Sequence, residues 1–236
     1  MTRVGGKRLF KDVAVAELDD GYGILLDEKS VRTPKRHALR LPTRPLADAI
    51  AAEWQAQREN VDPKTMPLTR LAGSAIDLVA PNRAEVIERT AAYAATDLLC
   101  YRAEGPRPLM ERQDRSWQPL IDWAGRRFSA PLAITRGIMA VDQPEETLRA
   151  LTLAVDSFDD MRLTALAAAT AECGSLVLAL ALAEREIDAE TAFELSQLDE
   201  TYQIELWGED PEAAARRNIL KADIAAAAHF LRLLEV

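Results

Sequence analysis

The residues of this chain that could do acid–base chemistry are its many carboxylates, and several of them stand side by side. The adjacent pairs are Asp159-Asp160, Asp199-Glu200 and Glu209-Asp210. Neighbouring residues on a helix point about 100° apart, so the two members of such a pair do not share one site. A pair of acids for proton transfer or glycoside cleavage therefore has no specific support in the sequence.

Metal, nucleotide and nucleophile chemistry have equally little support. The two histidines are His37, in a basic turn, and His229, which follows a run of alanines. The two cysteines, Cys100 and Cys173, are dispersed in apolar surroundings, as buried free thiols in a reducing compartment would be. The sequence contains no Walker-type loop, dinucleotide fingerprint or Gly-x-Ser-x-Gly elbow. We therefore expect no catalytic residue, no metal and no cofactor, and we expect that the protein is not an enzyme.

The segment from Phe193 to Asp210 has an unusual pattern for a helix. Gly208 is a residue that would end such a helix. At about 100° per residue the segment carries two apolar stripes on roughly opposite sides. The first stripe consists of Leu195, Leu198, Tyr202 and Leu206. The second consists of Phe193, Ile204 and Trp207, and it also contains Glu200.

A second apolar stripe needs an explanation, because an ordinary surface helix needs only one apolar face. The stripe must contact another part of the chain or another protein. Trp207 could pack in the core or act as an interface anchor, since tryptophan is common in both places. A carboxylate inside an apolar stripe needs hydrogen bonds or a cation. The partner of Glu200 could therefore be an arginine of this chain or one of another protein.

The surrounding elements divide the chain into two parts. Residues 7 to about 41 are typical of a small antiparallel sheet, with a hairpin signal at Asp19-Asp20-Gly21. Such a sheet needs a cover, and residues 43–54, with Thr43 as N-cap, predict the helix that covers it. The pattern after Pro81 predicts helices, among them single helices over 161–186, 189–207 and 211–234. We predict an α+β fold with a β-rich domain 1–80, which includes the covering helix, and a larger all-α domain 81–236.

The charge of the chain limits its partners. A formal net charge of −9 argues against nucleic acid or an anionic membrane as the main partner. Residues 184–212 hold 11 acidic residues and one basic residue, which forms either a solvated face or a surface that attracts a basic partner. The first ten residues contain no apolar run, and the apolar tract 163–183 is interrupted by Glu172. We therefore expect no secretory signal, no organelle presequence and no membrane insertion.

The motif Leu198-Asp199-Glu200-Thr201-Tyr202-Gln203, followed by Trp207-Gly208, resembles the most characteristic motif of an ATP synthase assembly chaperone family. The resemblance covers nearly the whole chain, because five further motifs agree in the same order. These motifs are Val31-Arg32-Thr33-Pro34, Glu53-Trp54-x-x-Gln57, Pro67-Leu68-Thr69, Thr96-Asp97-Leu98-Leu99-Cys100-Tyr101-Arg102, and Trp117-Gln118-Pro119-Leu120 with Trp123.

The resemblance implies a chaperone that binds the unassembled α subunit of the F(1) sector of ATP synthase and prevents its aggregation until the β subunit replaces the chaperone. It implies no catalysis and no nucleotide binding. It also implies a functional role for the acidic residue of the motif, which we assign to Glu200, with Asp199, where the family commonly has Glu, as the second choice. Together with Ile204, Trp207 and Phe193, these residues are the candidates for partner binding. Glu53-Trp54 is expected to be structural.

The resemblance further implies a free protein that is monomeric. Because no presequence is expected, it suggests a bacterial cytoplasmic member of a family whose eukaryotic relatives act in the mitochondrial matrix. Two alternatives stay open. A helical enzyme would show a deep pocket with several convergent carboxylates of perturbed pKa. A self-associating scaffold would use the second stripe to contact another copy of itself, which size-exclusion chromatography would detect.

Overall fold

The computed structural model describes residues 6–235. Half of the segment on which the expectation of no signal sequence depends, residues 1–5, lies outside the described residues. The fold is α+β, as predicted: a small antiparallel sheet near the N-terminus is followed by helices. Within the described residues, no helix is both long and apolar enough to cross a membrane.

The chain forms two compact units. The first comprises residues up to Arg83 together with the segments Asp159–Ala165 and His229–Val236, and the second comprises Ala84–Phe158 and Leu166–Ala228. Helices α6 (Asp160–Cys173) and α10 (Pro211–Leu233) thus contribute several residues to each unit, and Arg83 is both the last residue of the first segment of the first unit and the first residue of α3 (Arg83–Ala91). The domain boundary after residue 80 stays a prediction.

The first unit is built on the predicted hairpin. Strands β1 (Val13–Leu18) and β2 (Gly21–Leu26) pair antiparallel, and β3 (Lys29–Ser30) adds to β2. The turn between β1 and β2 requires Gly21, because its φ is +132° and a side chain there would meet the carbonyl oxygen of Leu41 at 2.5 Å. The hairpin signal in the sequence is therefore confirmed.

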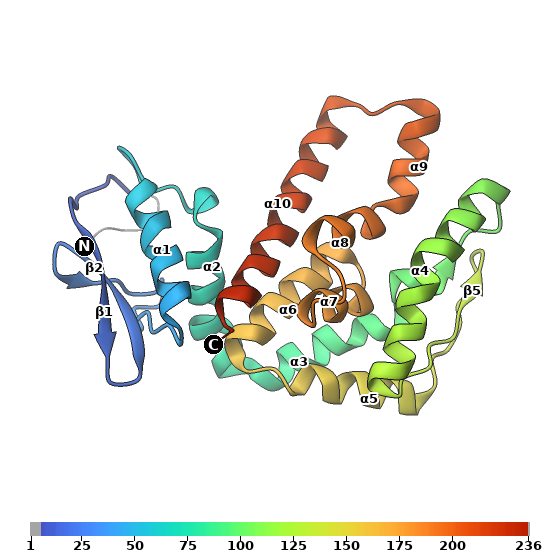
Figure 1. Cartoon of the computed structure of the whole chain (residues 1–236), viewed down its shortest axis with the longest axis horizontal. Coiled ribbons are helices and arrows are strands. Elements are labelled where there is room, and N and C mark those ends of the chain that lie inside the picture. The colour runs from blue at the N-terminus through green and yellow to red at the C-terminus, as the bar shows by residue number, and fades with distance from the viewer. Residues whose placement is uncertain (1–5, 236) are drawn as a thin grey trace. The chain divides into compact units, whose positions relative to one another are not determined.

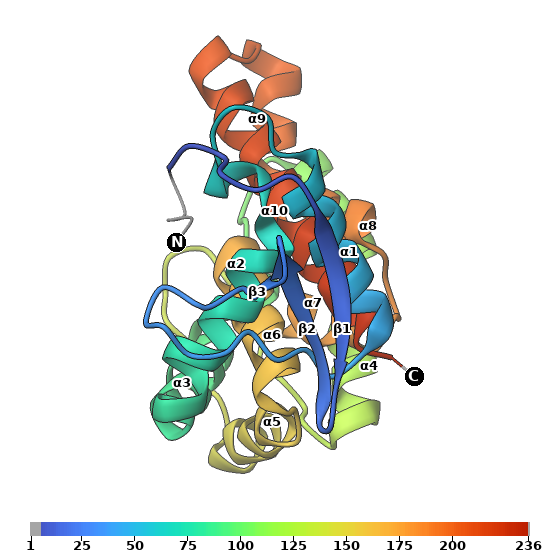
Figure 2. The ribbon, with the colours of Figure 1, turned by 90° about the vertical axis from the view of Figure 1, so that its left-hand side faces the viewer.

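Helix α1 (Arg44–Ala56) covers the sheet, as predicted, and α2 (Pro67–Ser74) packs on α1 (Figures 1 and 2). Thr43 caps α1 by accepting a hydrogen bond from the N–H of Leu46. Glu53 links the two helices, because its carboxylate accepts hydrogen bonds from the N–H groups of Leu68 and Thr69 in the first turn of α2, each 2.8 Å long. Glu53 thus has the structural position that was expected for it.

The helical unit surrounds one wholly apolar helix, α7 (Leu176–Ala183), whose residues from Leu176 to Leu182 are buried. Asp97, itself fully buried, holds the start of α7 by accepting hydrogen bonds from the Ser175 hydroxyl and the Val177 N–H. Helices α4 (Arg107–Phe128) and α8 (Ala189–Ser196) pack directly on α7. The unit also contains α5 (Glu145–Asp156), α9 (Leu198–Trp207), nearly all of α3 and parts of α6 and α10 (Figure 1). A parallel pair of two-residue strands, β4 (Tyr101–Arg102) and β5 (Thr135–Arg136), completes the unit.

The prediction of a single helix over 161–186 is wrong. The chain forms α6 and α7 instead, separated by Gly174, which has a left-handed φ of +64°. Ser175 begins the second helix by accepting a hydrogen bond from the N–H of Leu178. Apolar periodicity alone did not reveal this break, because alanine and leucine continue on both sides of it.

Candidate functional site

The segment with two apolar stripes is not one helix, so that prediction is also wrong. Helix α8 ends at Ser196, Gln197 leaves the helical conformation with φ −111° and ψ 23°, and α9 starts at Leu198. The Ser196 hydroxyl donates to the carbonyl oxygen of Phe193 at 2.9 Å, a local bond that competes with helical pairing. Gly208 ends α9 with a φ of +84°, as predicted. The break means that Phe193 and Trp207 belong to different helices.

One side of α9 is attached to α4 by polar contacts. Gln113, a fully buried residue of α4, donates from Nε2 to Oδ1 of Asp199 at 2.7 Å. Arg112 forms two parallel hydrogen bonds of 2.8 Å with the carboxylate of Glu205, and its guanidinium lies 5.4 Å from the ring centroid of Tyr202. These contacts fix the rotation of α9 about its own axis.

A second set of contacts, all made by Arg217, attaches α10 to the break. The guanidinium of Arg217 donates to Gln197 Oε1 at 3.3 Å and to Thr201 Oγ1 at 3.1 Å. It also pairs with Glu209 at 3.2 Å and lies 5.4 Å from the ring centroid of Phe193. One cation therefore connects α10 to α8, α9 and the turn between α9 and α10.

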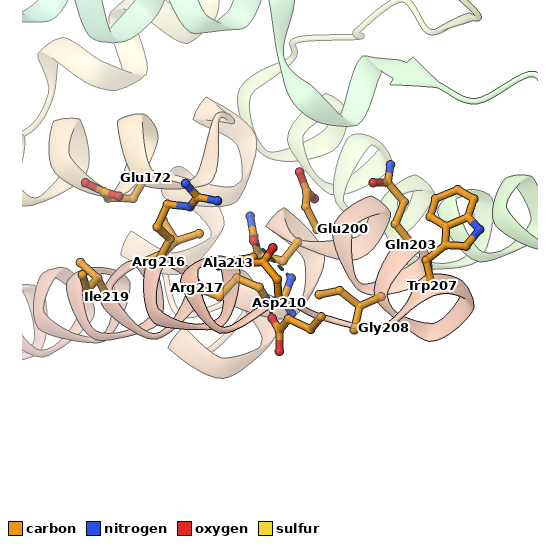
Figure 3. A pocket seen from close by; sticks show the side chains of 14 residues that line it. Glu172, Glu200, Gln203, Trp207, Gly208, Asp210, Ala213, Arg216, Arg217 and Ile219 are labelled. Carbon is orange, nitrogen blue, oxygen red and sulfur yellow. Dashed lines mark hydrogen bonds and ion pairs between the residues drawn. The ribbon is translucent and has the colours of Figure 1, made fainter.

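An open groove of about 580 Å³ lies between the free side of α9 and the first half of α10 (Figure 3). Its apolar lining comes from Ile204, Trp207, Ala213, Ile219 and Leu220. Its charged lining comes from Glu172 of α6 and from Glu200, Glu209, Asp210, Arg216 and Arg217.

Glu200 and Trp207 lie together on this groove. They are seven residues apart, so about two helical turns place them on the same side of α9, where Gln203 also projects (Figure 3). Trp207 is 78% exposed, which is unusual for a tryptophan. Glu200 is exposed, and among residues 6–235 it has neither a hydrogen bond nor an ion pair. The structure thus turns Glu200 away from the interior and toward solvent.

The other two candidate residues lie elsewhere. Asp199 faces α4 through its hydrogen bond to Gln113. Phe193 is only 9% exposed, because Arg217 and Lys221 of α10 cover its ring. Of the five candidates, the groove therefore brings together Glu200, Ile204 and Trp207. A role of any of them in partner binding stays a prediction.

The groove is acidic because its two arginines already have carboxylate partners. Arg217 pairs with Glu209, and Arg216 pairs with Glu212 at 3.1 Å. Burial raises the pKa of Glu172, and the nearby Asp223 raises it further. Neither Glu172 nor Glu200 has an ion-pair partner among the described residues, so a cationic group that enters the groove would meet two carboxyl groups without a counter-charge of their own.

Two groove residues outside α9, Ile219 and Glu172, were not predicted from the sequence. Ile219 is 63% exposed and lies on α10, whereas Glu172 comes from α6. The signal that could have found Ile219 is the polar surroundings of this apolar residue within Arg216-Arg217-Asn218-Ile219. No sequence signal connects Glu172 with Glu200, because only the packing of α6, α9 and α10 brings both of them to one groove.

The arrangement is suited to binding rather than to catalysis. Exposed apolar side chains beside unpaired carboxylates offer a surface to a segment that carries both an apolar and a basic side chain. Trp207 could also contact a cation through its ring face. Within residues 6–235, no group of three or more His, Cys, Asp and Glu side chains is arranged to hold a metal ion.

The sequence of this chain is similar to those of known proteins. Residues 7–125 match the model of a family described as ATP12 chaperone protein. The mitochondrial protein atp12 of Schizosaccharomyces pombe is 25% identical over 242 residues, which cover 97% of this chain and 83% of that protein.

Two solved structures match nearly the whole chain. The crystal structure of Atp12 from Paracoccus denitrificans matches with a TM-score of 0.93 and 44% identity, and the match covers 98% of this chain and 99% of that one. An aspartate-to-lysine variant of the P. denitrificans protein matches with a TM-score of 0.93 and 43% identity over 98% of each chain.

Proposed function

The chain belongs to the ATP12 chaperone family and is an assembly factor of ATP synthase rather than an enzyme, and from this premise we propose that it binds the unassembled α subunit of the F(1) sector. Binding would keep the α subunit from aggregating until the β subunit replaces the chaperone. A bacterial cytoplasmic location belongs to the same proposal and is supported by the likeness to the P. denitrificans protein.

The observation that carries the proposal is the groove between α9 and α10. An unassembled subunit exposes apolar surface that its neighbours would later cover, and such surface aggregates. The exposed side chains of Trp207 and Ile219, with the half-buried Ile204 on the same groove, offer apolar area of the kind that would cover it. The α subunit is the client of this proposal. Glu200 would meet a basic side chain of the client, because the Glu200 carboxylate has no partner among the described residues.

The groove also suggests how the client is released. It is open to solvent and its contact residues are few, so a permanent partner with a larger interface can displace the chaperone by affinity alone. No nucleotide and no covalent step is needed for this exchange. The order of events would be capture of the α subunit, protection from aggregation, and replacement by the β subunit.

The scaffold alternative makes a different prediction. If the exposed face of Trp207 contacted a second copy of this chain, the protein would be a dimer at micromolar concentration. Our proposal expects a monomer in size-exclusion chromatography with light scattering, and a 1:1 complex once the α subunit is added.

The experiment that tests the function is capture followed by competition. The tagged protein is co-expressed with the α subunit alone, purified, and then titrated with the β subunit. We expect co-purification of the α subunit and its release by the β subunit. Absence of the α subunit from the purified material, with both proteins soluble, would show that the proposed function is wrong.

A further inference from the structure

A second exposed apolar feature of the helical unit lies far from the groove in sequence. The loop that follows β5 carries Ile138, which is 99% exposed, and Met139, which is 72% exposed. Single exposed apolar residues are common, but two adjacent large apolar residues that are both mostly exposed contribute little to the core of the fold. We refer to Ile138 and Met139 as the loop tip.

Hydrogen bonds hold the loop tip in a defined conformation. The N–H of Gly137 donates to the carbonyl oxygen of Arg102 at 2.8 Å, and the Thr135 hydroxyl donates to the carbonyl oxygen of Met139 at 3.1 Å. Gly137 has a φ of +78°, a left-handed conformation that favours glycine. These contacts lie on both sides of Ile138 and direct its side chain into solvent.

The loop and the groove are attached to the same turn of α4. Arg112 and Gln113 bind α9 through Glu205 and Asp199. On the other side, Gln113 Oε1 accepts the N–H of Ala103, which follows β4, at 2.8 Å. The next residue, Asp114, accepts hydrogen bonds of 2.7 Å from Arg102 of β4 and from Arg136 of β5. Three consecutive residues of α4 thus set the position of α9 relative to the loop (Figure 1).

The charges near the loop tip indicate what kind of partner it fits. The only cation between Thr135 and Asp142 is Arg136, and both carboxylate oxygens of Asp114 accept its hydrogen bonds. Loops and helices that enter anionic membranes combine apolar with free basic residues, whereas this loop continues to the acidic Asp142. An uncharged apolar tip fits an apolar crevice of a protein.

We propose that the loop tip is a second contact with the client, at which Ile138 and Met139 enter an apolar crevice of the same subunit that the α9–α10 groove binds. This inference rests on the proposed function, because its occupant is the unassembled α subunit. Two contacts within one compact unit reinforce each other, since binding at one raises the effective concentration at the other.

The test is a loop-tip variant with a matched control. The full-length double variant Ile138→Ser/Met139→Ser is compared with Leu153→Ser, which removes another apolar side chain, 63% exposed, from α5 of the same unit. We expect the double variant to bind purified α subunit about tenfold or more weakly, with an unchanged melting temperature. Leu153→Ser should bind like the wild type.

Three results would overturn the inference. If the wild type binds the α subunit and the double variant binds it equally well, the loop tip is not a client contact and the proposed function stands. If the wild type binds anionic vesicles and the double variant does not, the tip serves a membrane instead. If the wild type fails to bind the α subunit at all, the proposed function and this inference fail together.

Discussion

Gln113 donates a hydrogen bond of 2.7 Å from Nε2 to Oδ1 of Asp199. This contact turns one member of an adjacent acidic pair toward α4. Since neighbouring helical residues point about 100° apart, the other member, Glu200, then lies on the open side of α9. A buried amide in α4 thus decides which of two adjacent carboxylates can reach a partner.

The first prediction concerns the charge of Glu200. Glu200→Lys should abolish capture of the α subunit, because a cation would then meet the basic side chain of the client. The melting temperature should change little, since Glu200 has no partner among the described residues and is exposed. The matched control is Glu194→Lys, which makes the same charge change on the exposed side of α8 outside the groove. Equal loss of capture in both variants would point to net charge rather than to the groove.

The second prediction concerns Trp207 as an anchor. Trp207→Ser should weaken α-subunit binding by about 2 kcal/mol, or roughly 30-fold, while stability changes by less than about 0.5 kcal/mol because the ring is 78% exposed. Titration calorimetry and urea denaturation measure the two effects. Trp207→Phe keeps an aromatic ring and should recover part of the affinity. A large loss of stability in the serine variant would show that Trp207 is a folding residue.

The third prediction distinguishes a residue that positions α9, Gln113, from residues that contact the client. Gln113→Leu removes a buried amide that satisfies both Ala103 N–H and Asp199, so it should destabilise the protein by about 2–4 kcal/mol. Binding should fall together with stability, unlike in Glu200→Lys. Urea denaturation and binding assays on the same preparation measure both. An unchanged unfolding free energy would mean that this contact does not hold α9.

The fourth prediction concerns the pH dependence of the stability that Asp77, a residue of the first unit, provides. Burial by itself would raise the pKa of Asp77, but hydrogen bonds from the Thr33 hydroxyl, the Lys35 N–H and the His37 ring outweigh burial and lower this pKa below 3.8. The unfolded chain then takes up the proton more readily than the folded protein. The stability from Asp77 is therefore present above the unfolded pKa of 3.8 and is lost as the pH falls through the lower, folded pKa.

Asp77→Asn provides the measurement for this prediction. At neutral pH it should cost about 1–3 kcal/mol, because it replaces a carboxylate acceptor of buried hydrogen bonds. The difference from the wild type should shrink as the pH falls below 3.8 and through the lower, folded pKa of Asp77, where the wild-type carboxyl also becomes neutral. Chemical denaturation between about pH 3 and pH 7 tests the trend. A difference that is independent of pH would exclude ionisation of Asp77 as its cause.

The sequence by itself determined the features that depend on neighbours along the chain. The β1–β2 hairpin follows from Asp19-Asp20-Gly21, and the α1 start follows from the Thr43 cap, because turns and caps are local chemistry. The stop of α9 follows from Gly208 for the same reason. Sequence periodicity also placed Glu200, Ile204 and Trp207 on one side of a helix, and the groove contains all three.

Only the tertiary structure decided the features that depend on contacts between distant segments. The break at Gln197 removed Phe193 from the stripe, and Arg217 of α10 then covered its ring. The hydrogen bond from Gln113 directs Asp199 toward α4 and leaves Glu200 on the open side of α9, and no spacing within 193–210 could reveal which of the two would face α4. Two further residues of the groove, Ile219 and Glu172, come from α10 and α6 rather than from α9. Periodicity gives the direction of a side chain from its own helix, but what that side chain contacts depends on the helices that fold against it.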